Sequence, residues 1–490
     1  MHKAPVLNHL PTILLSSCLL AACQTTTIDP APGDELSARP TSKAEAPRPP
    51  STTGSVPPNP VADGGNPARN LAPAIQASAG SLTMETAVRR AVGWHPAVDE
   101  ATGRIYQADE RIRAAQAGYY PKLNAGVASG YQSSNREGWR PNFNVSASQM
   151  LYDFGKVSSS VDIERAVKDI SNARLLLAID DLSRDTANAV VEVQRYRRLS
   201  ALAQEQVAGV KVIAGLVNQR TDKGASTMSD KVQADARVES ALATQLQYQS
   251  ELNRWQVALG ALIGGGSPNP VSGEPGWLGK ACDAATPDWE EVPAMLQAKA
   301  EKEEAEAQLA ASRAEALPTV SLEAMTGYDL NASRDDTRSN DRQPEYSVGL
   351  NVSSNLYNGG QTAARKRAAA YALQSAEAAI STARYDIERN LMEARSQIGT
   401  LGRLMGSLES RANMMVKTRD LYREQYLELG TRTLLDLLNA EQELHESRFQ
   451  IANTVHDLRR LNISCLYNFG KIRREFGINP AMVRGGTVSQ

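Results

Sequence analysis

Two long stretches of the chain carry an apolar repeat that is typical of coiled-coil helices. Within 387–429, apolar or small residues recur at alternating spacings of four and three, and within 437–465 an apolar series repeats every seven residues. Within 182–217, smaller residues recur at the same spacings of four and three. No proline occurs in 142–267 or in 345–479. Because a proline inside a helix removes a hydrogen bond and clashes with the preceding turn, these gaps leave room for very long helices.

Four shorter segments alternate between apolar and polar residues with a period of two, which predicts strands with one apolar face. Each is about ten residues long, enough for a tilted strand to cross a bilayer, so one face suits lipid and the other suits water. The connecting segments 132–141 and 331–344 are polar. The apolar positions are Leu123, Ala125, Val127, Tyr131, Phe143, Val145, Ala147, Leu151, Val320, Leu322, Ala324, Tyr328, Leu330, Tyr346, Val348, Leu350, Val352 and Leu356.

The chain repeats itself with a period of about 200 residues. The Leu-Tyr-Asp-Phe-Gly sequence at 151–155 returns as Leu-Tyr-Asn-Gly-Gly at 356–360, and Gly224 with its following helix returns as Gly430. Each half reads as helix, strand, strand, long helix, tight turn and helix. We therefore predict two tandem repeats, 81–280 and 281–478.

Helix lengths agree with this division. A helix over 156–222 measures roughly 100 Å at 1.5 Å per residue. We expect two shorter helices, 82–118 and 226–262, to flank it end to end.

The N-terminus resembles a bacterial lipoprotein signal. A weakly basic start and an apolar stretch lead to Leu-Ala-Ala before Cys23, the small-residue cleavage pattern of such signals. We expect removal of 1–22 and acylation of Cys23; the alternative is an ordinary secretory signal that contains a cysteine. By resemblance to bacterial lipoproteins, Gln24 favours sorting to the outer membrane.

The following segment, 23–80, is predicted to be a disordered tether. Eleven of the chain's 24 prolines lie between Pro30 and Pro73, among Ser, Thr and Gly. Such a segment buries too little apolar surface to offset its ordering entropy. A short tail, 479–490, follows the second repeat.

Charge and chemical motifs exclude several classes of function. The 53 basic and 55 acidic residues give a net charge of −2, without the basic field that nucleic-acid binding needs. The sequence has no phosphate-binding glycine loop, nucleophile elbow or zinc motif. His445 and His456 have no Cys or His partner at metal-ligand spacing. We predict neither an enzyme nor a cofactor nor a metal site.

Two cysteines remain once Cys18 is removed and Cys23 is acylated. Cys282 and Cys465 are able to pair in an oxidising periplasm. Cys465 also falls on an apolar heptad position, which suits a buried thiol. Both alternatives stay open, and neither cysteine is assigned a function.

These features together resemble the TolC family of outer-membrane efflux proteins over 81–477. The most specific stretch is 429–440, Leu-Gly-Thr-Arg-Thr-Leu-Leu-Asp-Leu-Leu-Asn-Ala, which is similar to the family's periplasmic hairpin tip. Residues 117–121 and 151–156 are similar to its strand entry and exit.

The resemblance implies a mainly α fold with a small β part. Long helical hairpins would form an α-helical barrel, and each chain would add four strands to a 12-stranded barrel in a homotrimer. No apolar run reaches the roughly 20 residues of a membrane helix, and open strand edges are not tolerated in lipid. Four strands alone cannot enclose a channel. The strand pattern itself therefore also requires several chains to contribute strands to one barrel.

The family further implies a passive duct in the bacterial outer membrane that extends into the periplasm. The duct would belong to a tripartite export system, for type I protein secretion or multidrug efflux. A periplasmic adaptor protein and an inner-membrane ABC or RND transporter would open it. The exported substrate, whether protein, drug or metal, is not determined by the sequence.

Site residues follow from the same resemblance. Adaptor docking would use Gly224, Gly430, Thr431 and Arg432 at the hairpin tips, although both glycines also serve the turns themselves. Arg432 would pair with Asp230 to hold the entrance shut. Asp436 would face the lumen, unless it and Arg432 are ordinary solvated charges.

Two positions depart from the family pattern. Asn439 stands where the family often has aspartate, and Leu427 stands where a gating tyrosine is common. We therefore expect fewer acidic side chains and fewer polar contacts to hold the entrance closed than the family pattern provides.

The rival hypothesis is a structural coiled-coil envelope lipoprotein that does not transport. A pure tether needs no lipid-facing strands, so the four alternating segments disfavour it.

Overall fold

Two helices of unusual length dominate the structure. The computed structural model describes residues 82–132, 138–265, 273–283, 286–329 and 345–478, all within one compact unit. Helix α3 (Lys156–Asp222) has 67 residues, or about 100 Å, and has the predicted bounds. Helix α6 (Gln361–Glu424) has 64 residues. The long helices predicted from the proline gaps are confirmed.

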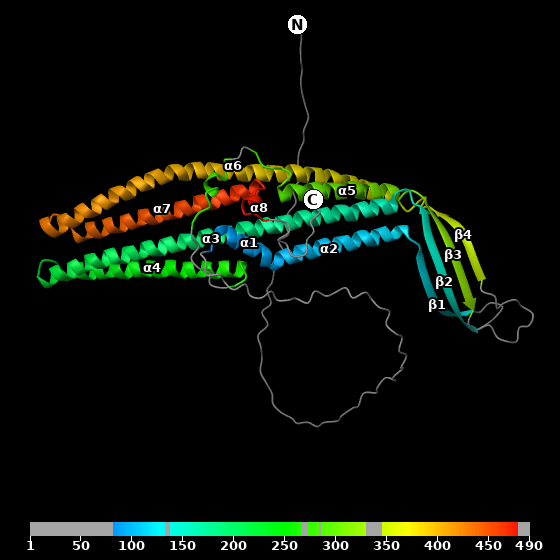
Figure 1. Cartoon of the computed structure of the whole chain (residues 1–490), viewed down its shortest axis with the longest axis horizontal. Helices are drawn as coiled ribbons and strands as arrows, with labels where there is room; N and C mark the ends of the chain where they lie inside the picture. Colours follow the sequence, from blue (N-terminus) through cyan, green and yellow to red (C-terminus); the bar gives the residue numbers. More distant parts are fainter. Residues whose placement is uncertain (1–81, 133–137, 266–272, 284–285, 330–344, 479–490) are drawn as a thin grey trace, which may run out of the picture. The chain divides into compact units, whose positions relative to one another are not determined.

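The remaining helices lie along these two (Figure 1). Each long helix ends in a tight turn and is followed by a returning helix of 35 residues. Among the described residues, no helix is both long and apolar enough to cross a membrane. The other helices are α1 (Met84–Trp94), α2 (Pro96–Gln116), α4 (Met228–Leu262), α5 (Pro293–Ala314), α7 (Leu434–Asn468) and α8 (Ile472–Glu475), with short 3-10 helices at Ala117–Tyr119 and Leu278–Lys280.

The predicted helix over 82–118 is wrong in one respect, because it breaks at His95. This residue is extended, with φ −71° and ψ 131°, and it ends α1 and begins α2. Its ring Nδ1 accepts a hydrogen bond from the Ala97 N–H at 3.3 Å. The cause is Pro96, since a proline disfavours the α conformation of the residue before it.

A single four-stranded antiparallel sheet adjoins the ends of α2, α3, α5 and α6 (Figure 1). Its order is β1-β2-β3-β4, so hairpins from the two repeats sit side by side. The strands are β1 (Lys122–Gln132), β2 (Gly138–Tyr152), β3 (Thr319–Asp329) and β4 (Glu345–Ser353).

The register places the predicted apolar positions on one face. Ala147 lies opposite both Leu123 and Ala324, and Ala324 lies opposite Val348. The predicted alternation is therefore confirmed. Two details differ: β4 ends before Leu356, and 138–141 belong to β2 instead of the loop.

Several predictions fall outside the described residues. They are the signal 1–22, acylation of Cys23, the tether 23–80, the tail 479–490, Leu330, and most of the two loops between paired strands.

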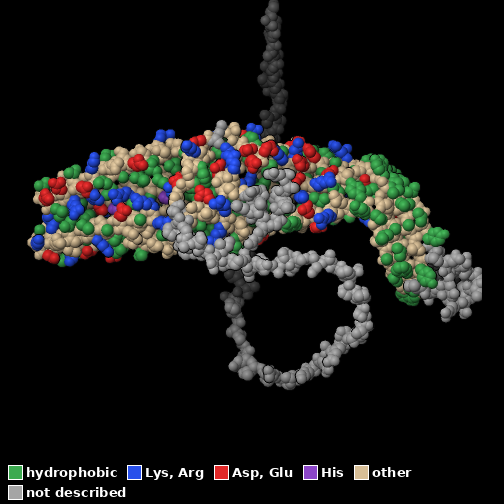
Figure 2. All heavy atoms as spheres, viewed as in Figure 1, with side chains coloured by type: hydrophobic (Ala, Val, Ile, Leu, Met, Phe, Trp, Pro, Cys, Tyr) green, Lys and Arg blue, Asp and Glu red, His purple; other side chains and the backbone are tan. Residues whose placement is uncertain are grey.

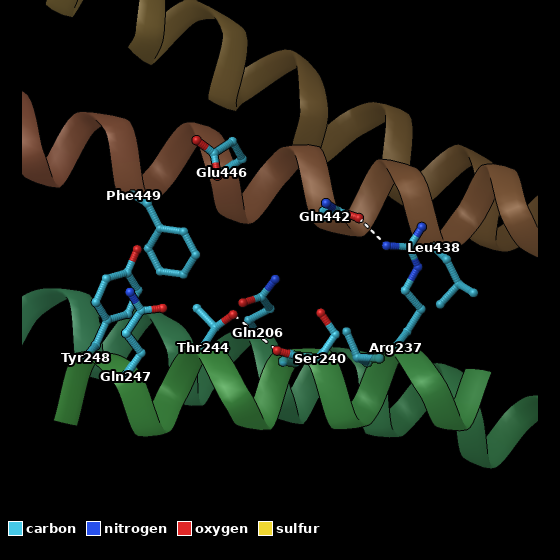
Figure 3. Close-up of a pocket in the computed structure, with 12 residues that line it drawn as sticks. Gln206, Arg237, Ser240, Thr244, Gln247, Tyr248, Leu438, Gln442, Glu446 and Phe449 are labelled. Carbon is cyan, nitrogen blue, oxygen red and sulfur yellow. Dashed lines mark hydrogen bonds between the residues drawn. The ribbon is translucent and has the colours of Figure 1, made fainter. Parts of the chain in front are cut away.

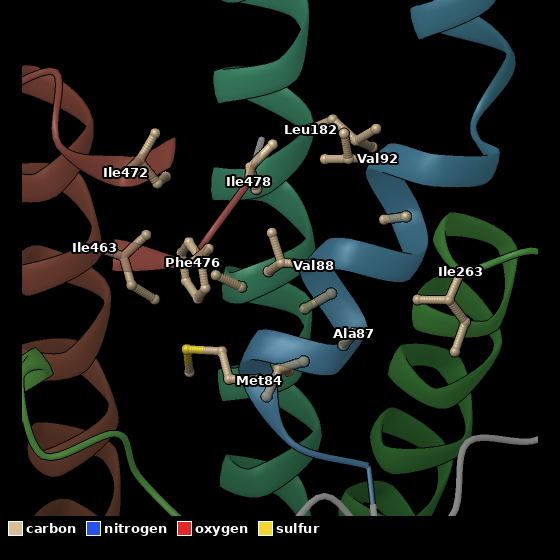
Figure 4. Packing of buried hydrophobic residues seen from close by; sticks show 14 of the residues in the cluster. Met84, Ala87, Val88, Val92, Leu182, Ile263, Ile463, Ile472, Phe476 and Ile478 are labelled. Atoms are coloured by element: carbon tan, nitrogen blue, oxygen red, sulfur yellow. The ribbon is translucent and has the colours of Figure 1, made fainter. Parts of the chain in front are cut away.

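The largest core cluster lies midway along the helices, where α1 and α8 pack against α3 (Figure 4). Met84 and Val88 of α1 and Phe476 are at most 1% exposed. Small residues such as Ala187 fill the spaces between larger ones. This belt fixes the chain's first and last described helices to the long helix.

The two cysteines form a disulfide, so the alternative of a buried thiol is wrong. Cys282 lies between the 3-10 helix Leu278–Lys280 and α5, and Cys465 lies on α7, with 5.3 Å between their Cα atoms. Their sequence separation of 183 residues makes this a long covalent loop. The bond joins the segment before α5 to the helix that returns from the second tip.

We expect Cys282→Ser with Cys465→Ser to lower the free energy of unfolding by about 2–5 kcal/mol, because a cross-link restricts the unfolded chain. Denaturant titration with and without reductant measures the effect. Reductant should destabilise the wild type and leave the double variant unchanged. Equal stability of wild type and variant under oxidising conditions would contradict a structural role.

A buried ion pair holds α8 to α3. Asp180 is 0% exposed, and its Oδ2 lies 2.6 Å from Arg473 Nη1. Arg473 Nη2 also donates to the Glu291 carbonyl at 2.6 Å. Burial raises the pKa of Asp180 from 3.8 to about 7, although Arg473 opposes the rise.

This raised pKa predicts a pH dependence of stability. The folded state holds the Asp180 proton more tightly than the unfolded state, so stability should fall as pH rises from about 4 to about 7. Asp180→Asn should remove this component, which amounts to a few kcal/mol, and thermal unfolding at several pH values tests it. If the wild type and Asp180→Asn have parallel pH profiles, the shifted pKa is refuted.

Candidate functional site

The two hairpin tips are built to the same local design. Gly224 has φ 66° and Gly430 has φ 63°, the left-handed conformation that glycine adopts without strain. Three residues after each glycine a threonine caps the returning helix, and three residues later an aspartate completes the cap. The glycine, threonine and aspartate thus have identical spacing in both repeats.

The predicted gate aspartates are these capping residues. Asp230 Oδ2 accepts from the Thr227 N–H at 3.0 Å, and Asp436 Oδ2 accepts from the Thr433 hydroxyl at 2.9 Å. Asp436 is half-buried, while Gly224 and Gly430 are exposed. Both aspartates therefore have a helix-capping role in addition to any role at the entrance.

Arg432 and Asp230 do not meet within the described chain. Arg432 lies 4.0 Å from Asp436, donates to Gln425 Oε1 at 3.2 Å, and stacks 4.5 Å from the centre of the Tyr422 ring. The structure thus brings Arg432 together with Asp436, while Thr431 beside it is exposed.

A π-helical turn, η3 (Gln425–Leu429), precedes Gly430. Such turns are rare and often mark functional sites. Tyr426 in this turn is 6% exposed, and its hydroxyl lies 3.2 Å from Ser226 Oγ in the first tip. A tyrosine therefore does link the tips, one residue before the position at which the family pattern suggested one.

Arg220 on α3 strengthens the same link. Its Nη1 donates to the carbonyls of Tyr426 and Leu427 at 3.2 and 3.3 Å, and its Nη2 donates to the Ala225 carbonyl at 3.5 Å. The guanidinium also lies 4.9 Å from the centre of the Tyr426 ring. One cation thus binds backbone groups of both tips, a role that sequence reasoning missed.

A second polar bridge lies farther from the tips (Figure 3). Arg237 on α4 donates to Gln442 Oε1 at 2.6 Å and to Asn439 Oδ1 at 3.3 Å, both on α7. The bridge closes one end of a largely polar cleft of about 270 Å³ among α3, α4 and α7. Asn439 is therefore a hydrogen-bond partner between helices even though it carries no charge.

The apolar sheet face is the other candidate surface. Hydrophobic side chains gather over the strands, in contrast to the mixed charges along the helices (Figure 2). Val348 and Leu350 are each 70% exposed. An exposed apolar patch of this extent indicates a protein or membrane partner.

Comparison with known proteins identifies the family. The outer membrane efflux protein family matches residues 87–265 and 290–461, which is most of the chain. The chain belongs to this family.

Individual family members are distant relatives. The outer membrane protein TolC of Salmonella enteritidis is 24% identical over 390 residues, covering 75% of this chain and 77% of the relative. The alkaline protease secretion protein AprF of Pseudomonas aeruginosa is 23% identical over 336 residues, covering 64% and 66%. The structure of the outer membrane protein VceC from Vibrio cholerae has a TM-score of 0.69 at 19% identity, covering 79% and 96%.

Membership of the outer membrane efflux protein family confirms three predictions. The fold is the predicted mainly α fold with a small β part, the protein is located in the outer membrane, and it is a transport protein instead of an enzyme. The resemblance stated from the tip sequence and the strand pattern is also confirmed.

A buried charged cluster in this outer membrane efflux protein was not predicted. Glu441 and His445 on α7 are each at most 3% exposed, with 3.2 Å between Glu441 Oε1 and His445 Nε2. Arg419 on α6 lies 3.8 Å from the same carboxylate. Gly209 on α3 leaves the space that Glu441 occupies. His456 is also buried, and the described residues contain no cluster suited to a metal ion.

Proposed function

We propose that the protein is the trimeric duct of a tripartite export system for type I protein secretion or multidrug efflux. One observation carries the proposal: a four-stranded sheet with a largely exposed apolar face and unpaired outer edges on β1 and β4. Unpaired edges are not tolerated in lipid, and four strands cannot enclose a channel. Three chains supply twelve strands for the barrel, and their helices continue it into the periplasm.

The sheet's aromatic residues support this placement in a bilayer. Aromatic rings concentrate at membrane interfaces, and exposed rings here occupy both ends of the strands. One set lies near the strand hairpins and the other lies where the strands meet the helices: Tyr131, Trp139, Tyr328 and Tyr346, and then Tyr119, Tyr120, Tyr152, Phe154 and Tyr357.

We assign the periplasmic entrance to the tips. Gly224, Gly430, Thr431 and Arg432 are exposed there and are proposed to meet a periplasmic adaptor. Arg432 with Asp230 of a neighbouring copy, and Asp436 toward the lumen, are proposed to form the gate. Arg220 and Tyr426 complete it within each copy.

The proposed partners are an adaptor protein and an inner-membrane ABC or RND transporter. The likeness to AprF, a protein named for alkaline protease secretion, supports a role in protein export. The two repeats are proposed to be 81–280 and 281–478, after a signal at 1–22 and a tether at 23–80. We also propose acylation at Cys23, and a mature protein that retains residues before Cys23 would refute it.

Mass measurement in detergent tests the assembly. We expect the purified full-length mature protein to have three times the mass of the mature chain. A stable monomer or dimer would contradict the duct, whereas loss of the tether by proteolysis should leave the trimer intact.

A further inference from the structure

Basic side chains gather where the helices meet the sheet. We define the junction as the last two turns of α2 and α5, the first two turns of α3 and α6, their connections to the strands, and the strand residue next to each connection. It contains eight basic and four acidic residues: Arg111, Arg113, Lys122, Lys156, Arg313, Arg365, Lys366 and Arg367, against Glu110, Asp153, Asp162 and Glu315. This positive excess contrasts with the chain's net charge of −2.

All four junction carboxylates are already engaged. Glu110 and Asp162 pair with neighbouring arginines of their own helices at 2.6 and 2.9 Å. Glu315 pairs with Arg365 across α5 and α6. Asp153 is buried and accepts from two N–H groups at the start of α3, at 3.0 and 2.6 Å.

Five junction cations are exposed and make no ion pair with any described residue. Their charge is therefore available to an outside partner. They are Arg111, Lys122, Arg313, Lys366 and Arg367.

In the proposed barrel, the junction lies at the depth of lipid headgroups. It begins where the strands end, so its nearest residues adjoin the hydrocarbon region that the apolar face occupies. Lys366 is five residues beyond the first residue of α6, or about 8 Å along its axis. The headgroup layer extends roughly 5–8 Å beyond the hydrocarbon on each side. Long basic side chains can reach back into that layer.

Exposed rings accompany these cations at the same level. Tyr120 is 68% exposed and Tyr357 is 88% exposed. Rings at this depth lie at the boundary between acyl chains and headgroups. Aromatic and cationic side chains together match the surface of an anionic membrane, whose field attracts clustered Lys and Arg.

We infer that the junction binds anionic phospholipids of the periplasmic leaflet of the outer membrane. The inference rests on the proposed barrel, since the strands set the depth of the junction. Lys366 and Arg367 are its central residues, because both are exposed, adjacent and without an acidic neighbour in their turn.

Lipid binding to the purified full-length trimer tests this inference. The probe is phosphatidylglycerol, with zwitterionic phosphatidylethanolamine for comparison, and bound lipids are counted by native mass spectrometry. We expect Lys366→Gln with Arg367→Gln to weaken phosphatidylglycerol binding about tenfold and to leave phosphatidylethanolamine binding unchanged. Glycerol phosphate should not displace the lipid, which separates a membrane surface from a simple phosphate site.

The matched control is Arg403→Gln with Arg411→Gln. These exposed residues lie on the same helix, far from the junction, and the charge change is identical. The control should bind phosphatidylglycerol like the wild type. The inference is overturned if the junction variant binds phosphatidylglycerol as strongly as the wild type does. It is also overturned if the junction variant and the control variant lose phosphatidylglycerol binding equally.

Other outcomes separate this inference from the proposed duct. If the junction variant lost trimer mass while the control kept it, the cations would contact a neighbouring copy and the lipid assignment would be wrong. If wild-type protein formed no trimer, the duct itself would fail. A conducting trimer without lipid preference would leave the duct standing and remove only the lipid surface.

Discussion

Arg220→Ser should raise the single-channel conductance of the trimer in planar bilayers several-fold. Arg220 donates three hydrogen bonds to tip carbonyls and stacks on Tyr426, so it holds the second tip against the first. Hydrogen bonds that involve a charged group contribute about 1.5–3 kcal/mol each. Three copies acting together reach the roughly 5.5 kcal/mol that moves an equilibrium from mostly closed to mostly open.

Two further variants separate the parts of this entrance. Tyr426→Phe removes only the hydroxyl contact with Ser226 and should raise conductance less. Arg432→Ser tests the proposed link to Asp230 of a neighbouring copy. Arg198→Ser, an exposed change on α3 away from the tips, is the control. If Arg220→Ser and the control conduct alike, the tip contacts do not hold the entrance shut.

Leu350→Arg should strongly reduce assembly of the trimer in the outer membrane. Leu350 lies on the apolar face of β4, opposite Leu322, and is 70% exposed. An arginine facing lipid near the middle of a bilayer costs about 2–4 kcal/mol, and each trimer would carry three copies. Membrane fractionation and the yield of trimer in detergent measure the loss.

The neighbouring position supplies the control. Asn351 points to the opposite face, where its side chain donates to Glu323 Oε1 at 2.8 Å. Asn351→Arg therefore introduces the same charge beside an acidic residue on the water-facing side and should leave assembly close to wild type. Similar losses in both variants would mean that the apolar face does not meet lipid.

The periodicity of the sequence was sufficient to predict the main architecture of long helices and a small sheet. A period-two alternation determines which strand face is apolar, because neighbouring side chains point to opposite sides. Proline gaps with heptad spacing likewise located α3 to the residue. The break at His95 was also readable, since Pro96 restricts the residue before it.

The contacts between the two tips could not all be predicted from the sequence in the same way. The identical spacing from Gly224 to Asp230 and from Gly430 to Asp436 is present in the sequence and signals both caps. Arg220 has no such signal, because its partners are backbone carbonyls, two of them about two hundred residues away, and any residue type presents a carbonyl. The pairing of Cys282 with Cys465 likewise depends on distance in the fold.

Conductance of the purified wild-type trimer tests the central claim most directly. Protein of trimeric mass should insert into planar bilayers and give discrete current steps with no nucleotide or other energy source, and larger steps after Arg220→Ser. Trimers that insert but carry no current, in the wild type and in Arg220→Ser alike, would contradict a passive duct.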